Sequence, residues 1–186
     1  MENKFFSGKT LGWCLAFIVC CNMHLIAQEK AKSDSLKIEI KQVEAQKAIV
    51  IKLSVPTMEI GPKMGEAYGK LFSHLGMNNL SPAGPPFAVY YEFDPNGNTT
   101  FEAGVPVSGD VKAEGEIAFK EYPAMKVVSA LYKGGYENMM HAYTSIDKYI
   151  KDNKLEKQAP SWEVYLTNPM EVKPEENQTL IYFPVK

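Results

Sequence analysis

An internal repeat without gaps is the feature that most constrains this fold. Shifting residues 64–90 by 75 positions places them on residues 139–165. The identical pairs include Met64 and Met139, Ala67 and Ala142, Tyr68 and Tyr143, Asn78 and Asn153, Pro85 and Pro160, Val89 and Val164, and Tyr90 and Tyr165. A chain that repeats itself over this length builds the same supersecondary unit twice.

Each copy has the pattern strand, helix, strand, strand. The first contains the β-branched run 47–55, apolar residues at helical spacing over 64–75, and two strand-like runs, 85–93 and 99–107, joined by the turn sequence "DPNGN". The second repeats this order in the runs 125–132, 139–150, 161–168 and 179–185. We therefore predict an α+β fold of two such units, about 36–110 and 111–186. Its sheet is mostly antiparallel, with both helices on one face and a ligand cleft between the halves.

The first 27 residues have the character of a secretory signal peptide. Two lysines precede a short apolar run that is too short for a comfortable membrane span. We predict removal of residues 1–27, a polar lead over 28–35, and a periplasmic or extracellular protein with no transmembrane segment. A lipoprotein anchored through Cys20 or Cys21 is the alternative. All three cysteines lie in this leader, so the mature chain has no disulfide or thiolate site.

The charged residues argue against phosphate-bearing partners. The 20 basic residues are all lysine, the formal net charge is −2, and removal of Glu2, Lys4 and Lys9 makes it −3. Arginine is the residue that best recognises phosphate in a bidentate way, and this sequence has none. Nucleic acid is therefore not expected as a partner, and a neutral or cationic ligand suits the chain better.

A single carboxylate, Glu163, interrupts the apolar run "SWEVYL". Because side chains alternate along a strand, we expect Trp162, Val164 and Leu166 to face the helices while Glu163 and Tyr165 line the cleft. The repeat then places Ala88, Tyr90 and Glu92 on the cleft side of the first copy, with Phe87, Val89 and Tyr91 toward the helix. The alternative is that Glu163 lies on a solvated face of the sheet.

Several motifs resemble the GyrI-like small-molecule-binding domain, the effector-binding domain of AraC- and MerR-type multidrug regulators. They are the strand 103–107, the turn 122–124, the helix start at Lys133, Gly134, Tyr136 and Glu137, and "PSWEVYLTNP". The resemblance covers about 36–186 and implies a cleft that binds organic, often cationic, molecules against aromatic side chains and a strand glutamate. Glu163 matches that glutamate, and Tyr90, Tyr165 and Tyr136 become lining residues. Gly135 replaces the family's proline, and no DNA-binding segment is recognised.

Three functions follow in order of preference. The first is an exported, non-enzymatic binder of an organic molecule, cationic or aromatic, without a cofactor. The second is a hydrolase of electrophilic small molecules that uses Glu163 as the base and Tyr165 or Tyr136 as the proton donor. The third is haem binding, which needs an axial histidine in the cleft. We predict no metal site, because His74 and His141 are the histidines outside the leader and neither belongs to a ligand motif.

Overall fold

The computed structural model describes residues 36–186. The predicted signal peptide, the polar lead and the two candidate lipidated cysteines, Cys20 and Cys21, lie outside these residues. The strands are β1 (Ile38–Val43), β2 (Gln46–Pro56), β3 (Phe87–Phe93), β4 (Asn98–Val107), β5 (Ala118–Tyr122), β6 (Met125–Lys133), β7 (Ser161–Tyr165) and β8 (Gln178–Pro184). The main helices are α2 (Ile60–Met77) and α3 (Met140–Asp152), with short 3₁₀ turns at Thr57–Glu59, Tyr136–Asn138 and Pro174–Glu176.

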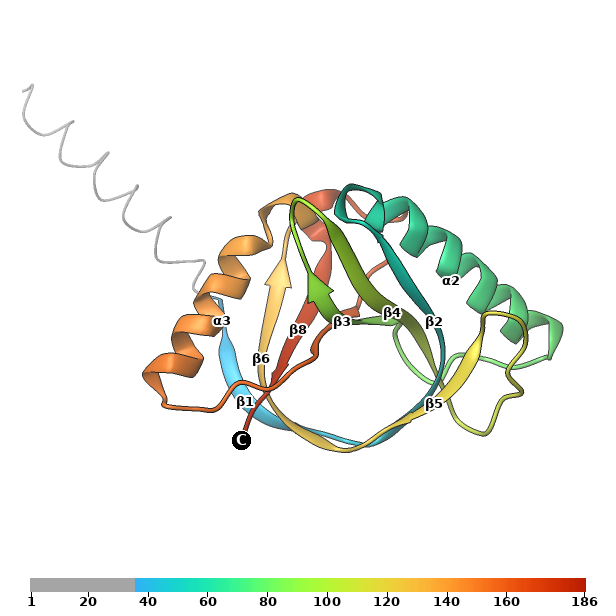
Figure 1. Cartoon of the computed structure of the whole chain (residues 1–186), viewed down its shortest axis with the longest axis horizontal. Helices are drawn as coiled ribbons and strands as arrows, with labels where there is room; N and C mark the ends of the chain where they lie inside the picture. The colour runs from blue at the N-terminus through green and yellow to red at the C-terminus, as the bar shows by residue number, and fades with distance from the viewer. Residues whose placement is uncertain (1–35) are drawn as a thin grey trace, which may run out of the picture. The chain divides into compact units, whose positions relative to one another are not determined.

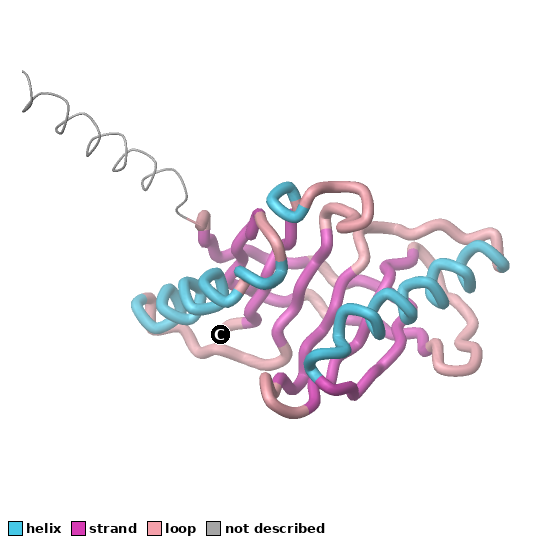
Figure 2. The backbone as a smooth tube through the Cα atoms, turned by 90° about the horizontal axis from the view of Figure 1, so that it is seen from above, coloured by secondary structure: helices cyan, strands magenta, loops and turns pink. Residues whose placement is uncertain are grey.

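The predicted fold class is confirmed. The eight strands form one curled sheet in the order β1-β6-β8-β7-β3-β4-β2-β5, and every paired neighbour is antiparallel. The units β2-α2-β3-β4 and β6-α3-β7-β8 are the two copies of the repeat (Figure 1). Figure 2 shows both helices lying along the sheet, one over each half. Among residues 36–186, no helix combines the length and apolar character needed to cross a membrane.

The two copies meet at the centre of the sheet, where β3 pairs with β7. Ala88 lies directly opposite Glu163 in this pairing, and these two positions are also related by the 75-residue shift. A position that faces its own repeat equivalent marks a local twofold axis. The pseudo-symmetry axis of the domain therefore passes between Ala88 and Glu163.

Each half also contributes its first strand to the other half. β1 pairs with β6, and β5 pairs with β2. Because the pairing of Val43 with Met125 is followed by that of Gln46 with Tyr122, β1–β2 and β5–β6 form one continuous two-stranded ribbon. Figure 1 shows the middle of this ribbon, between β1 and β5, on the side of the sheet away from the helices. The repeat pattern did not identify β1 or β5 as strands.

The ribbon explains why the predicted orientation of the central strands is wrong. Ala88 and Tyr165 pack in the core under α2, together with Ala67 and Leu71, and this side is the helix face of the sheet. Phe87, Val89, Trp162 and Val164 point the other way and pack with Val127 and Tyr182 on what we call the ribbon face. Leu166 lies beyond β7 and is exposed. Both faces are apolar because both are covered, so hydrophobic alternation could not distinguish them.

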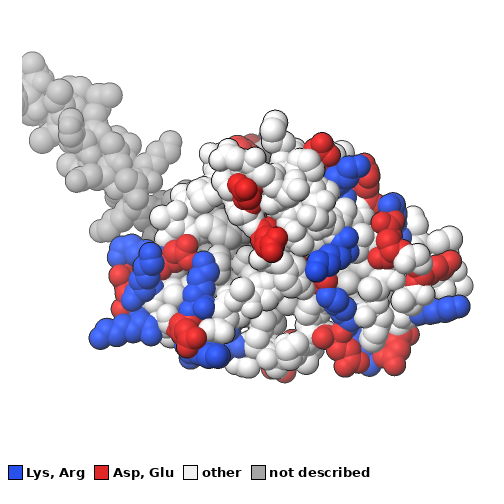
Figure 3. All heavy atoms as spheres, viewed as in Figure 1, with Lys and Arg blue, Asp and Glu red and all other residues white. Residues whose placement is uncertain are grey.

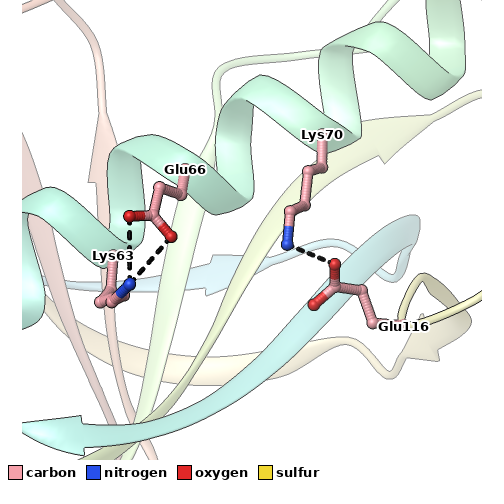
Figure 4. Close-up of polar contacts among 4 residues, drawn as sticks. All are labelled: Lys63, Glu66, Lys70 and Glu116. Carbon is pink, nitrogen blue, oxygen red and sulfur yellow. Dashed lines mark hydrogen bonds and ion pairs between the residues drawn. The ribbon is translucent and has the colours of Figure 1, made fainter.

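Helix α2 is also fastened to the segment that leads into β5. Lys70 pairs with Glu116 at 2.5 Å, while Lys63 pairs with Glu66 one turn apart on the helix at 3.0 Å (Figure 4). These groups are exposed, and such pairs contribute little to the free energy of unfolding. The buried faces described above therefore hold the helix in place.

Candidate functional site

Glu163 lies on the helix face between the two helices, and its carboxylate is almost fully enclosed. The residue is only 7% exposed. Three tyrosine hydroxyls donate hydrogen bonds to it: Tyr165 donates to Oε2 at 2.8 Å and Tyr90 to the same oxygen at 3.4 Å. Tyr143, from α3, donates to Oε1. The alternative that Glu163 lies on a solvated face of the sheet is therefore wrong.

Two further tyrosines extend this cluster. Tyr68 of α2 packs edge-on against the ring of Tyr165 at 6.3 Å and donates to the carbonyl of Phe87 at 2.8 Å. Tyr136, at the start of the 3₁₀ turn before α3, packs against the same ring at 6.2 Å and is 42% exposed. Of the predicted lining residues, Tyr90, Tyr165 and Tyr136 thus lie together around Glu163. Tyr136 forms the outer edge of the cluster.

The sequence analysis did not include Tyr143 among the candidate site residues. A signal for its role was present, because a buried tyrosine on the sheet-facing side of a helix needs a partner for its hydroxyl. Both helices place a tyrosine at the same repeat position, and Glu163 is the acceptor for the one on α3. The helix tyrosine is therefore part of the site.

Burial is the main cause of the raised pKa values of Glu163 and of the tyrosines around it. Enclosure raises the pKa of Glu163, although hydrogen bonds from Tyr143, Tyr165 and Tyr90 act in the opposite direction. Burial and the neighbouring carboxylate raise the pKa values of Tyr143, Tyr165 and Tyr90, so these hydroxyls remain donors. Glu163 takes part in none of the ion pairs within residues 36–186. Its described partners are neutral donors.

The twofold axis explains why only one copy of the repeat carries a glutamate. Directly opposed side chains of antiparallel strands have Cβ atoms about 5 Å apart. A glutamate at both Ala88 and Glu163 would place two carboxylates against each other in a buried site. Ala88 is fully buried beside Glu163, so its part in the site is to leave room for a single carboxylate.

Glu92 does not belong to this site, contrary to the prediction. The pairing of β3 with β4 shifts between Tyr90 and Glu92, which is a β-bulge. After the bulge Glu92 lies opposite Thr100 and accepts a hydrogen bond from its hydroxyl at 3.5 Å. Thr100 precedes Phe101, which packs on the helix face, so Glu92 and Thr100 lie on the other side. An extra residue in a strand changes which face the following side chains occupy.

A second buried carboxylate, Glu102, lies on the ribbon face and was not predicted as a site residue. Its side chain is ion-paired with Lys120 and accepts hydrogen bonds from Tyr91 at 2.7 Å and Tyr122 at 2.8 Å. Burial alone would raise the pKa of Glu102, but these partners outweigh it and the pKa lies below its usual value. Glu102 is thus a neutralised structural acid, whereas Glu163 has no cationic partner within residues 36–186.

The two histidines of the described residues lie away from Glu163. His74 is buried in α2 and its Nε2 lies 3.2 Å from the carbonyl of Lys112. His141 lies near the start of α3 against the ring of Tyr132. Within residues 36–186, no three His, Cys, Asp or Glu side chains gather as metal ligands. Neither histidine could serve as an axial haem ligand beside Glu163 in this arrangement.

Several solved structures have a similar fold. The EcmrR C-terminal domain has a TM-score of 0.69 and 22% identity over 82% of this chain and 99% of that one. In an EcmrR–DNA complex the match covers 91% of this chain and spans 65% of the length of EcmrR. A hydrolase from Listeria innocua has a TM-score of 0.64 at 13% identity, over 87% and 97% of the two chains. SAV2435, solved bound to tetraphenylphosphonium, has a TM-score of 0.56 at 14% identity, over 81% and 94%.

At these identities the likeness establishes the fold alone, and no curated protein matches the chain. The family model carries more weight because it extends over the whole described domain. It is the GyrI-like small molecule binding domain, and it matches residues 36–186. This chain therefore belongs to the GyrI-like family of small-molecule-binding domains.

Proposed function

We propose that this protein binds an organic cation with aromatic or other apolar groups, and that Glu163 supplies the charge that selects it. The observation that carries the proposal is a buried carboxylate whose described partners are all neutral hydroxyls. Burying a carboxylate without a positive partner is costly, and a cationic ligand removes that cost.

The tyrosines around Glu163 suit the rest of such a ligand. The ring of Tyr165 packs edge to face with the rings of Tyr68 and Tyr136, so three aromatic rings lie beside the carboxylate. A cation over an aromatic ring gains about 0.5–2 kcal/mol, depending on how well it is desolvated. The hydroxyls enclose Glu163, so a ligand must displace at least one of them. Tyr136 is the most exposed and lies where a ligand would enter.

Isothermal titration calorimetry with two ions of the same shape tests the proposal. Tetraphenylphosphonium and tetraphenylborate differ in the sign of their charge, and SAV2435 was solved with the first bound. We expect the wild-type protein to bind the phosphonium and to bind the borate far more weakly. Glu163→Gln should weaken phosphonium binding by about 10- to 100-fold, because a charge-assisted contact is worth about 1.5–3 kcal/mol.

Glu102→Gln is the matched control, since it removes the other buried carboxylate, on the opposite face of the sheet. Its phosphonium affinity should equal that of the wild type, because Lys120 already neutralises Glu102. Equal phosphonium binding by the wild type and Glu163→Gln would show that the glutamate does not select the ligand. A larger loss of phosphonium affinity in Glu102→Gln than in Glu163→Gln would show that the cation binds on the ribbon face and would contradict the proposal.

A hydrolase remains the second candidate, and one observation favours it. The raised pKa of Glu163, beside the hydroxyl of Tyr165 at 2.8 Å, is the arrangement of a general base with a proton donor. The three hydroxyls that occupy the carboxylate argue against it, because a base must be free to accept a proton from water. Hydrolysis of an epoxide or similar electrophile that is lost in both Glu163→Gln and Tyr165→Phe would establish this activity.

We also propose that the protein is exported and acts outside the cytoplasm without a nucleic-acid partner. Support comes from the signal-peptide pattern of residues 1–27 and from the complete lack of arginine. N-terminal sequencing of the exported protein should begin at or near Gln28. A mass that corresponds to a lipid on Cys20 or Cys21 would instead establish a membrane-anchored lipoprotein.

A further inference from the structure

The ribbon face forms a pocket that has no part in the Glu163 site. Its volume is about 630 Å³, and it lies between the ribbon and the strands beneath. Val43, Gln46 and Met125 line it from the ribbon, while Phe87, Trp162 and Tyr182 line it from the sheet. In Figure 3, mostly uncharged atoms fill the lower centre of the surface, over the region where Figure 1 draws the ribbon. The sheet itself separates this pocket from Glu163.

The floor of this pocket is a packed aromatic group on the twofold axis. Phe87 and Trp162 are repeat equivalents, and their rings stack with centroids 5.2 Å apart. Tyr122 packs edge-on against Trp162 at 4.6 Å. The floor is thus apolar and closely packed, and aromatic and aliphatic groups bind well to such a surface.

The charge beside the pocket is positive. None of the residues that line it is acidic, and the lysine among them, Lys47, is ion-paired with Asp110 at 2.6 Å. Lys41 lies over the ring of Tyr182 at 4.5 Å and donates to its hydroxyl at 3.1 Å. Within residues 36–186 Lys41 belongs to no ion pair.

The pseudo-symmetry of the domain allows the charge of Lys41 to be compared with that of Lys120, the equivalent lysine on the other half of the ribbon. Lys41 and Lys120 each stand two residues before the end of their ribbon strand, β1 at Val43 and β5 at Tyr122. Lys120 is neutralised by Glu102, which is buried. Lys41 has only the phenol of Tyr182 among the described residues. One side of the ribbon face is therefore electrically balanced and the other retains a positive charge at an apolar pocket.

We propose that the ribbon-face pocket is a second ligand site, which binds a compact apolar molecule carrying one carboxylate, with Lys41 as the counter-charge. The apolar body lies on Phe87 and Trp162, and the carboxylate lies at the Tyr182 edge within reach of the Lys41 ammonium. Its charge preference is opposite to that of the Glu163 site.

Fluorescence and calorimetric titrations of the full chain carrying Trp13→Phe test this site, because Trp162 is then the only tryptophan. The probes are adamantane-1-carboxylate and its uncharged carboxamide, which do not absorb where tryptophan is excited. We expect the carboxylate to change the emission of Trp162 and to bind about tenfold more tightly than the amide. Lys41→Gln should remove that difference, since about tenfold is the scale of one charge-assisted contact.

Two further variants show whether the probes bind in this pocket or elsewhere on the protein. Gly84 lines the pocket, and a Cβ there would meet only Pro106 at ordinary contact distance, so Gly84→Leu should fill the space and abolish binding of both probes. Glu163→Gln should leave both affinities unchanged. The proposal is overturned if the carboxylate leaves Trp162 emission unaltered, if acid and amide bind equally, if Lys41→Gln keeps the preference, or if Glu163→Gln rather than Gly84→Leu removes binding.

Discussion

Moving the glutamate across the twofold axis tests the account of the site most directly. Ala88→Glu places a second carboxylate opposite Glu163 with Cβ atoms about 5 Å apart. Two like charges at that distance repel by about 3 kcal/mol at an effective dielectric constant of about 20. We expect this variant to be strongly destabilised at neutral pH, because both positions are buried.

The double variant Ala88→Glu with Glu163→Ala should recover that loss. The transferred glutamate finds equivalent donors, since Tyr68 corresponds to Tyr143 and Tyr90 corresponds to Tyr165 in the repeat. Urea denaturation followed by circular dichroism should show the double variant to be about 3 kcal/mol more stable than additivity of the single changes predicts. With an m-value of about 1–3 kcal/mol per molar urea, this corresponds to about 1–3 M in the midpoint. A coupling below about 0.5 kcal/mol would refute the symmetry argument.

Three further predictions concern single groups. Because burial raises the pKa of Glu163, this carboxyl keeps its proton to higher pH in the folded state than in the unfolded chain. The free energy of unfolding should therefore fall as the pH rises toward and through the folded-state pKa. Denaturation measured at a series of pH values should show this fall in the wild type and not in Glu163→Gln. Lys120→Met leaves the carboxylate of Glu102 buried with neutral partners only. It should lower the free energy of unfolding by about 1–3 kcal/mol in the same assay, a range that allows for the partial exposure of Lys120. An unchanged free energy of unfolding would show that the tyrosine hydroxyls alone stabilise Glu102. Gly134→Ala should lower the melting temperature at a cost of about 1–3 kcal/mol, because Gly134 has φ +145° and a Cβ there would lie 2.7 Å from the hydroxyl of Tyr132; an unchanged melting temperature would contradict that strain.

The sequence by itself determined the repeat, and through it most of the fold. Helical spacing after a β-branched run identified α2 and α3, and the "DPNGN" turn identified the β3–β4 hairpin. These signals depend only on residues that are close together in the sequence, so they can be recognised without knowing what packs against each element. The repeat also singled out Glu163, because aligning the two copies is enough to reveal a charge in one and an alanine in the other.

The tertiary structure alone decided which groups meet at Glu163. Hydrophobic alternation along a strand separates its residues into two faces, but it does not show which face the helices cover. Here both faces are apolar, because the helices cover one and the ribbon covers the other. The bulge after Tyr90 moved Glu92 out of the site, and the hydroxyl of Tyr143 came in from α3. The exchange of β1 and β5 between the halves joins residues far apart in the chain, and it created the ribbon-face pocket. Such contacts depend on the pairing of distant strands, for which the order of residues along the chain carries no local signal.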